Sequence, residues 1–151
     1  MISRRCLPLV LIITTLIAAC GARSTAPVTN SPSGDPVSVE GGAYTNIAAA
    51  QLADMLKSED FFFANTHIPY EGEIEQTDTF IPYDEITQRL DELPADRNAK
   101  IVLYCRSGRM SAIAAEALLT AGYTNVWNLD GGMIAWEEAG FSLRDCLKTL
   151  W

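Results

Sequence analysis

The sequence predicts an α/β fold, a sandwich of helices around a mostly parallel central sheet. Short, continuous apolar runs such as 101–104 suit strands that are buried on both faces. Segments rich in helix formers, such as 112–119, follow these runs. Glycine- and proline-bearing turns separate the two kinds of segment.

The first half of the domain begins with alternating strand and helix patterns. The sequence predicts a short strand, or the end of one, over 44–47. Asn46 is predicted to cap a helix over 48–57 whose apolar residues share one face. The phenylalanine run at 61–65 has strand length and lies between polar segments. We therefore interpret it as a core strand rather than as an exposed ligand-binding patch.

A long acidic connection follows at 66–82. It lacks the glycine and the distal glutamate of an EF-hand, so we interpret it as a solvated loop rather than as a calcium site. His67, the only histidine of the chain, lies in it. A structural or hydrogen-bonding role for His67 is favoured over the alternative of a base for Cys105.

The second half repeats the alternation. Residues 83–93 carry apolar residues at helical spacing, and a proline closes that helix. The remaining elements are expected to be a strand at 101–104, a helix at 111–121, a strand at 125–129 and a helix at 133–139.

The end of the central strand carries the chemistry. Cys105 follows the apolar run directly and precedes a polar, glycine-bearing loop that leads into a helix. The first N–H groups of a helix lack intrahelical partners, and the helix dipole is positive there, so a thiolate is stabilised. Arg106 and Arg109 add positive charge, and Gly108 allows a close backbone approach. The pattern predicts a cysteine nucleophile in an anion-binding loop.

These residues resemble the rhodanese (sulfurtransferase) family, in its single-domain form. The loop at 105–110 follows the family's Cys-Arg-x-Gly-x-x pattern, and 122–136 resembles its second signature. His67-Ile68-Pro69 and Phe80-Ile81-Pro82 are similar to its weaker N-terminal half. The resemblance implies a three-layer fold and a catalytic Cys105. No cofactor is expected, and no metal is expected because no cluster of residues has ligand spacing. The resemblance also implies a substrate-binding loop made of Arg106, Ser107, Gly108, Arg109, Met110 and Ser111.

Two positions depart from the family pattern. Many single-domain members carry an arginine where this chain has Met110. Many also carry Asp-Val-Arg where this chain reads Asn65-Thr66-His67, which removes an ion pair expected beneath the loop.

Three functions compete. The first is a sulfurtransferase that passes sulfane sulfur from thiosulfate or a similar small anionic donor, through a Cys105 persulfide, to a thiol or cyanide. The second is a phosphatase or arsenate reductase, although such relatives carry an arginine where this chain has Ser111. The third is a non-catalytic, lipid-tethered domain that carries sulfur or binds a protein partner.

The N-terminus resembles a bacterial lipoprotein signal. Residues 1–19 combine a short basic start with an apolar run that is too short to span a membrane comfortably. Cleavage before Cys20 and lipidation of that residue would anchor the protein to a membrane of the bacterial cell envelope, on its extracytoplasmic side. An ordinary signal peptide and an uncleaved anchor are the alternatives. A flexible linker is expected over 20–37 and the folded domain over 38–151.

The net charge and the cysteine content of the chain limit the classes of partner and of disulfide that it can have. The net charge of −8 becomes −10 without residues 1–19, because nine basic and 19 acidic side chains remain, and this argues against nucleic-acid binding. Only Cys105 and Cys146 lie in the predicted domain. A structural disulfide between them is the alternative to a catalytic Cys105.

Overall fold

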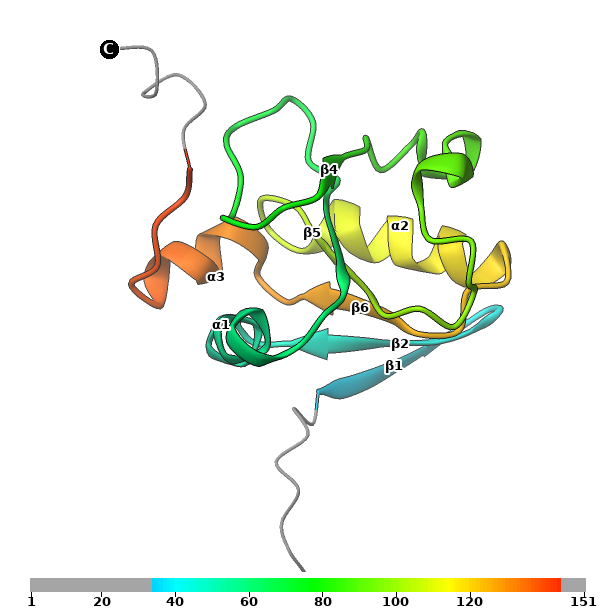
Figure 1. Ribbon diagram of the computed structural model, residues 1–151, viewed down its shortest axis with the longest axis horizontal. Coiled ribbons are helices and arrows are strands. Elements are labelled where there is room, and N and C mark those ends of the chain that lie inside the picture. The colour runs from blue at the N-terminus through cyan, green and yellow to red at the C-terminus, as the bar shows by residue number, and fades with distance from the viewer. Residues whose placement is uncertain (1–33, 145–151) are drawn as a thin grey trace, which may run out of the picture.

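The computed structural model of the protein describes residues 34–144, which form one sheet flanked by helices (Figure 1). The elements, in chain order, are β1 (Asp35–Val39), β2 (Gly42–Ile47), α1 (Ala49–Ser58), β3 (Phe62–Asn65), β4 (Thr79–Phe80), the 3-10 turns η1 (Ile86–Gln88) and η2 (Leu90–Glu92), β5 (Ile101–Tyr104), α2 (Arg109–Thr120), β6 (Val126–Leu129) and α3 (Gly132–Glu138).

The sheet has the strand order β1-β2-β6-β5-β3-β4, and β1 with β2 is the one antiparallel pair among these described strands. β5 lies between β6 and β3, and all four of its residues are buried, as the continuous apolar run predicts. Because β2, β6, β5 and β3 are parallel, their carboxyl ends meet at one edge of the sheet. The residue that follows β5 at this edge is Cys105.

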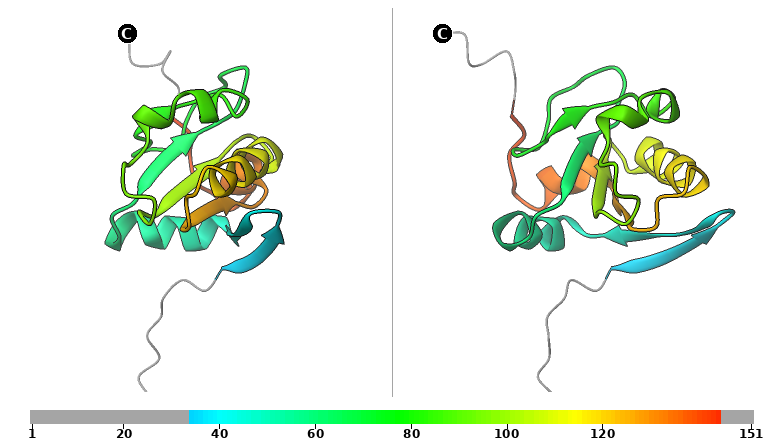
Figure 2. Two further views of the ribbon diagram at one scale, coloured as in Figure 1. Left: turned by 90° about the vertical axis from the view of Figure 1, so that its right-hand side faces the viewer. Right: turned by 45° about the vertical axis from the view of Figure 1, so that its right-hand side comes forward.

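Alternate residues of β5 face two separate cores. Ile101 and Leu103 pack in a cluster with residues of α2, whereas Val102 and Tyr104 pack in a second cluster with residues of α1 and α3. Helices therefore cover both faces of the sheet (Figure 2). The predicted three-layer α/β sandwich with a mostly parallel sheet is confirmed.

The helix predicted over 83–93 is wrong in type, because the segment forms η1 and η2 instead. Arg89 separates the two turns with a non-helical backbone (φ −121°, ψ 36°). Leu93 is extended (φ −96°, ψ 161°), as the steric demand of the following Pro94 favours. Ile86 and Leu93 are nevertheless buried, so the apolar pattern identified the inward-facing side chains correctly.

The linker predicted over 20–37 is too long at its C-terminal end. β1 starts at Asp35, which pairs with Asn46, so the ordered sheet begins before position 38. β1 is an edge strand, and Val37 and Val39 are only partly buried. Its polar and proline-bearing sequence therefore resembles a linker more than a strand.

Asn46 does not cap α1, contrary to the prediction. The N-cap residue is Ala48, whose N–H donates to Gln51 Oε1 at 2.8 Å. Asn46 Oδ1 instead accepts a hydrogen bond from Asn128 Nδ2 at 2.8 Å, which joins β2 to β6.

Several predictions concern residues outside those that the structure describes. These are the signal peptide at 1–19, the lipidation of Cys20 and the alternative of a disulfide to Cys146. Within residues 34–144, no helix has the length and apolarity needed to cross a membrane.

Candidate functional site

Cys105 lies at the carboxyl end of the central strand and is 1% exposed. α2 begins four residues later, and its N-cap residue Gly108 has a left-handed backbone with φ +84°. The carbonyl of Gly108 accepts the first intrahelical hydrogen bond, from Ala112 N at 3.1 Å. Among residues 34–144, no side chain caps this helix end. The N–H groups of its first turn are therefore available to an anion held beside Cys105.

A second glycine turn holds the backbone of the cysteine loop. Met133 N donates to the Cys105 carbonyl at 2.9 Å, and Ile134 N donates to the Arg106 carbonyl at 3.0 Å. A Cβ on Gly132, whose φ is +58°, would overlap the carbonyl oxygen of Cys105. Only glycine permits this approach, so the turn at 131–132 and the loop fit together through bare backbone.

The predicted substrate-binding residues form one continuous loop and first helical turn. Arg106, Ser107 and Arg109 are exposed, and Met110 is half-buried. Ser111 is buried, and its Oγ donates to the Gly108 carbonyl at 3.1 Å. Ser111 therefore fixes the loop from within and presents no charge at the position where phosphatase-type loops carry an arginine.

The two arginines of the loop differ in their partners. Arg106 Nη1 donates to Glu71 Oε2 at 2.5 Å, and both side chains are partly exposed. Arg109 makes no ion pair with any residue in 34–144. Glu71 carries no signal in the sequence as a partner of Arg106, because it lies 35 residues away in a connection whose composition is typical of a solvated loop.

His67 approaches the same carboxylate but does not bind Cys105. Its Nε2 lies 3.3 Å from Glu71 Oε2 without hydrogen-bond geometry. Both ring nitrogens are buried and have no hydrogen-bond partner among the described residues. This arrangement favours the structural role of His67 over that of a base for the cysteine.

An amide replaces the ion pair that the family pattern leads one to expect beneath the loop. Asn65 is fully buried; its Oδ1 accepts from His67 N and its Nδ2 donates to the Gly72 carbonyl, both at 3.0 Å. Thr66 adds a bond from its Oγ1 to the Tyr104 carbonyl at 3.0 Å. Neutral groups therefore satisfy this buried site without a charged pair.

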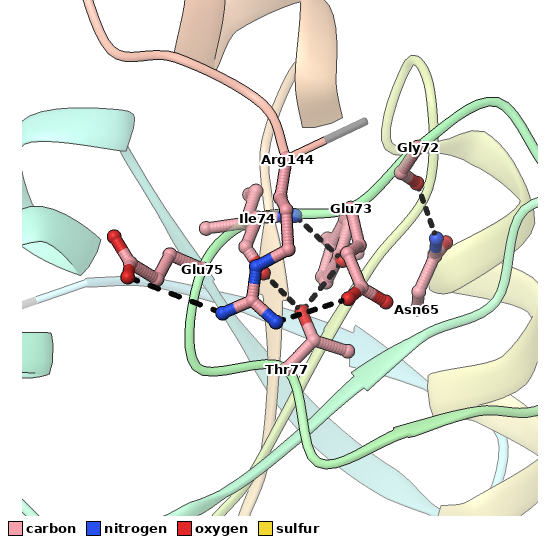
Figure 3. A network of polar contacts seen from close by, with 8 residues as sticks. Asn65, Gly72, Glu73, Ile74, Glu75, Thr77 and Arg144 are labelled. Atoms are coloured by element: carbon pink, nitrogen blue, oxygen red, sulfur yellow. Dashed lines mark hydrogen bonds and ion pairs between the residues drawn. The ribbon is translucent and has the colours of Figure 1, made fainter. Parts of the chain in front are cut away.

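The connection that carries Glu71 is fixed further along by Tyr104 and Arg144. The Tyr104 hydroxyl accepts from Ile74 N at 3.0 Å and lies 2.7 Å from Thr77 Oγ1, and burial raises the pKa of Tyr104, so it stays protonated. Arg144 pairs with Glu73 through two backbone hydrogen bonds. Figure 3 shows the Arg144 guanidinium between Glu73 and Glu75, at 3.6 and 3.9 Å.

A cleft of about 580 Å³ borders the loop at Ser107. The amino end of α1 and the turn before α3 form its walls, and Asp35 and Asp130 contribute carboxylates. None of the lining residues that the structure describes is a lysine or an arginine. The approach to the cysteine loop from this side is therefore acidic.

Comparison with known proteins matches the chain to the Rhodanese-like domain family over residues 43–139. A sulfurtransferase of Allochromatium vinosum is 43% identical over 63 residues, which cover 42% of this chain and 57% of that protein. A tRNA uridine(34) hydroxylase of Erwinia tasmaniensis is 30% identical over 113 residues, which cover 68% of this chain and 32% of that protein. The chain thus spans less than two thirds of the length of either relative.

Solved structures with the same fold include a rhodanese-related protein from Thermoplasma volcanium. It has a TM-score of 0.57 and 29% identity, and the match covers 67% of this chain and 98% of that one. A rhodanese-like domain protein from Staphylococcus aureus has a TM-score of 0.55 and 26% identity, over 66% of this chain and 98% of that one.

Proposed function

The chain belongs to the rhodanese-like domain family, and we propose that it is a sulfurtransferase working through a persulfide on Cys105. One observation carries the proposal: Cys105 precedes an uncapped helix N-terminus, in a loop whose backbone two glycine turns hold in place. Such a site stabilises both a thiolate and the anion that forms when sulfur is bound to it. The proposed donor is thiosulfate or a similar sulfane donor.

The proposed reaction has two covalent steps. The Cys105 thiolate attacks the outer sulfur of the donor, an S–S bond forms at Sγ, and the old bond breaks, so that sulfite leaves thiosulfate with the electron pair. A thiol or cyanide then attacks the terminal sulfur, and Sγ leaves as the thiolate. Free N–H groups of the first turn of α2 stabilise the persulfide anion. Arg109, with no partner among the described residues, attracts the donor.

Sulfur transfer from thiosulfate to cyanide by the purified protein tests this function. Cys105→Ser should abolish thiocyanate formation. Cys146→Ser is the matched control, because it removes the other thiol of the C-terminal half by the same substitution, and it should retain activity. Full activity of Cys105→Ser would overturn the proposal. Turnover of p-nitrophenyl phosphate would favour the phosphatase alternative instead.

A sulfur carrier is the second candidate. It is supported by the pairing of Arg106 with Glu71, which leaves one loop arginine to attract anionic donors. A carrier would form the Cys105 persulfide without turning over in the cyanide assay. Only a protein partner would then remove the sulfur.

A lipid anchor on Cys20, at the extracytoplasmic side of a bacterial membrane, is part of the proposal. Its support is the signal-like sequence at 1–20 together with the position of β1. β1 begins opposite Asn46 at the carboxyl end of β2. A tether from Cys20 would therefore join the domain at the sheet edge that carries Cys105, which would keep the site near the membrane.

A further inference from the structure

Glu71 is the charged neighbour of the cysteine loop that the proposed sulfur chemistry does not use. Its Oε2 accepts from Arg106 Nη1 at 2.5 Å, while His67 Nε2 lies 3.3 Å from the same oxygen. The carboxylate is thus positioned between an exposed arginine of the loop and a buried histidine. Arg106 therefore already has Glu71 as its ionic partner in the absence of a donor.

This ion pair changes the charge that a donor meets. The loop carries two arginines, and Glu71 offsets Arg106, so that Arg109 is the one loop arginine without an ion-pair partner within residues 34–144. Met110 supplies no further cation, and the adjoining cleft adds the carboxylates of Asp35 and Asp130. The energy of a ligand in a given potential scales with its charge, so the loss of one positive charge from the loop costs a dianion twice the attraction that it costs a monoanion. The pairing of Arg106 with Glu71 and the nearby carboxylates therefore shift the selectivity of the loop from dianionic toward monoanionic donors.

Stability does not account for the pair. The Arg106 and Glu71 side chains are 54% and 39% exposed, and ion pairs of this exposure contribute little to folding. The connection around Glu71 is fixed independently, by the Asn65 bond to Gly72 and by the Tyr104 hydroxyl. A glutamine at position 71 should therefore leave the fold intact.

We propose that Glu71 is a specificity-determining residue that sets the loop to accept sulfane sulfur from thiol persulfides, which carry one charge on their sulfur, in preference to thiosulfate. The inference rests on the proposed function. Cys105 Sγ attacks the terminal sulfur of the persulfide anion and forms a new S–S bond. The original S–S bond breaks, and the donor leaves as a thiolate with the electron pair, so that charge and atoms balance without an added oxidant or reductant.

The test compares two donors in single turnover, with the Cys105 persulfide measured by mass spectrometry after rapid quenching. The donors are thiosulfate and the persulfide of 2-mercaptoethanol, which is a monoanion. Glu71→Gln removes the charge but keeps an oxygen that can accept from Arg106. Glu75→Gln is the matched control, because it makes the same charge change on the same connection, where the carboxylate faces Arg144 rather than the loop.

Glu71→Gln should raise the second-order rate constant for thiosulfate about tenfold and that for the persulfide about threefold, since the energy of a dianion changes by twice that of a monoanion in the same change of potential. The higher rate constant for thiosulfate should come from a lower half-saturating concentration of thiosulfate. The difference between Glu71→Gln and the unmodified protein should shrink in 1 M salt, where charges are screened within about 3 Å. Glu75→Gln should leave the ratio of the two rate constants unchanged.

The other outcomes would overturn the role of Glu71 alone or the proposed function as well. Equal changes for both donors, or the same shift in Glu75→Gln, would overturn the assignment of Glu71 while leaving the sulfurtransferase proposal standing. A gain that persists undiminished in 1 M salt would also overturn it, because the effect would then not be electrostatic. No Cys105 persulfide from either donor in any variant would overturn the proposed function, and this inference with it.

Discussion

Replacement of Gly132 by alanine should disrupt the cysteine loop. Left-handed backbone at φ +58° costs a residue with a Cβ about 1–2 kcal/mol. The new Cβ would also overlap the carbonyl oxygen of Cys105, and relief of such overpacking costs about 1–3 kcal/mol more. The expected loss of stability is therefore about 2–5 kcal/mol. The hydrogen bonds from the first turn of α3 to the loop carbonyls would be the contacts displaced.

Gly140→Ala is the matched control. Gly140 has φ +88°, but nothing lies within 4 Å of the position of its Cβ, so only the backbone strain of about 1–2 kcal/mol applies. Urea denaturation gives both free energies of unfolding, and sulfur transfer reports on the loop. Gly132→Ala should be the less stable variant and lose most of its activity, whereas Gly140→Ala should keep it. Equal stabilities together with unchanged activity in Gly132→Ala would refute the reasoning.

Three further predictions follow from the buried polar groups and the N-terminus. Tyr104→Phe leaves Ile74 N without its buried acceptor and should cost about 1–3 kcal/mol in urea denaturation. Burial raises the pKa of Tyr104 above 10.0, so the contribution of this side chain to the free energy of unfolding should fall as pH rises above 10.0. Tyr104→Phe should lack this part of the pH dependence. Identical plots of unfolding free energy against alkaline pH for the two proteins would contradict the prediction. Asn65→Asp should destabilise the fold by about 1–3 kcal/mol or more, since a carboxylate cannot donate to the Gly72 carbonyl; an unchanged urea midpoint would count against this account. Cys20→Ala should abolish the incorporation of labelled fatty acid into the protein in a bacterial expression host, and unchanged incorporation into that variant would exclude lipidation of Cys20.

The central strand, the cysteine loop and α2 could be predicted because their signals are local. A four-residue apolar run, a glycine and a stretch of helix formers determine this unit within 20 residues of sequence. The two-faced burial of β5 also follows from its composition, since Ile101 to Tyr104 offers no polar face.

Predictions failed where tertiary context decides the structure. β1 contains Asp35 and Pro36, and only pairing with β2 distinguishes it from a linker. The segment at 83–93 has helical spacing, yet its backbone leaves helical geometry at Arg89 and forms two 3-10 turns, and Pro94 favours the extended conformation of Leu93.

Long-range polar contacts left no sequence signal at all. Glu71 meets Arg106 across 35 residues, and neither periodicity nor composition marks the pair. The role of Gly132 could not be predicted either. The two glycines at 131–132 predict a turn, but they do not predict that this turn packs against the backbone of Cys105.

Mass spectrometry of Cys105 before and after addition of cyanide tests the central claim most directly. Treatment with a sulfane donor should add one sulfur atom to the peptide that contains Cys105, and cyanide should remove it with formation of an equal amount of thiocyanate. Thiocyanate formation without sulfur on Cys105, or undiminished transfer in Cys105→Ser, would contradict the account.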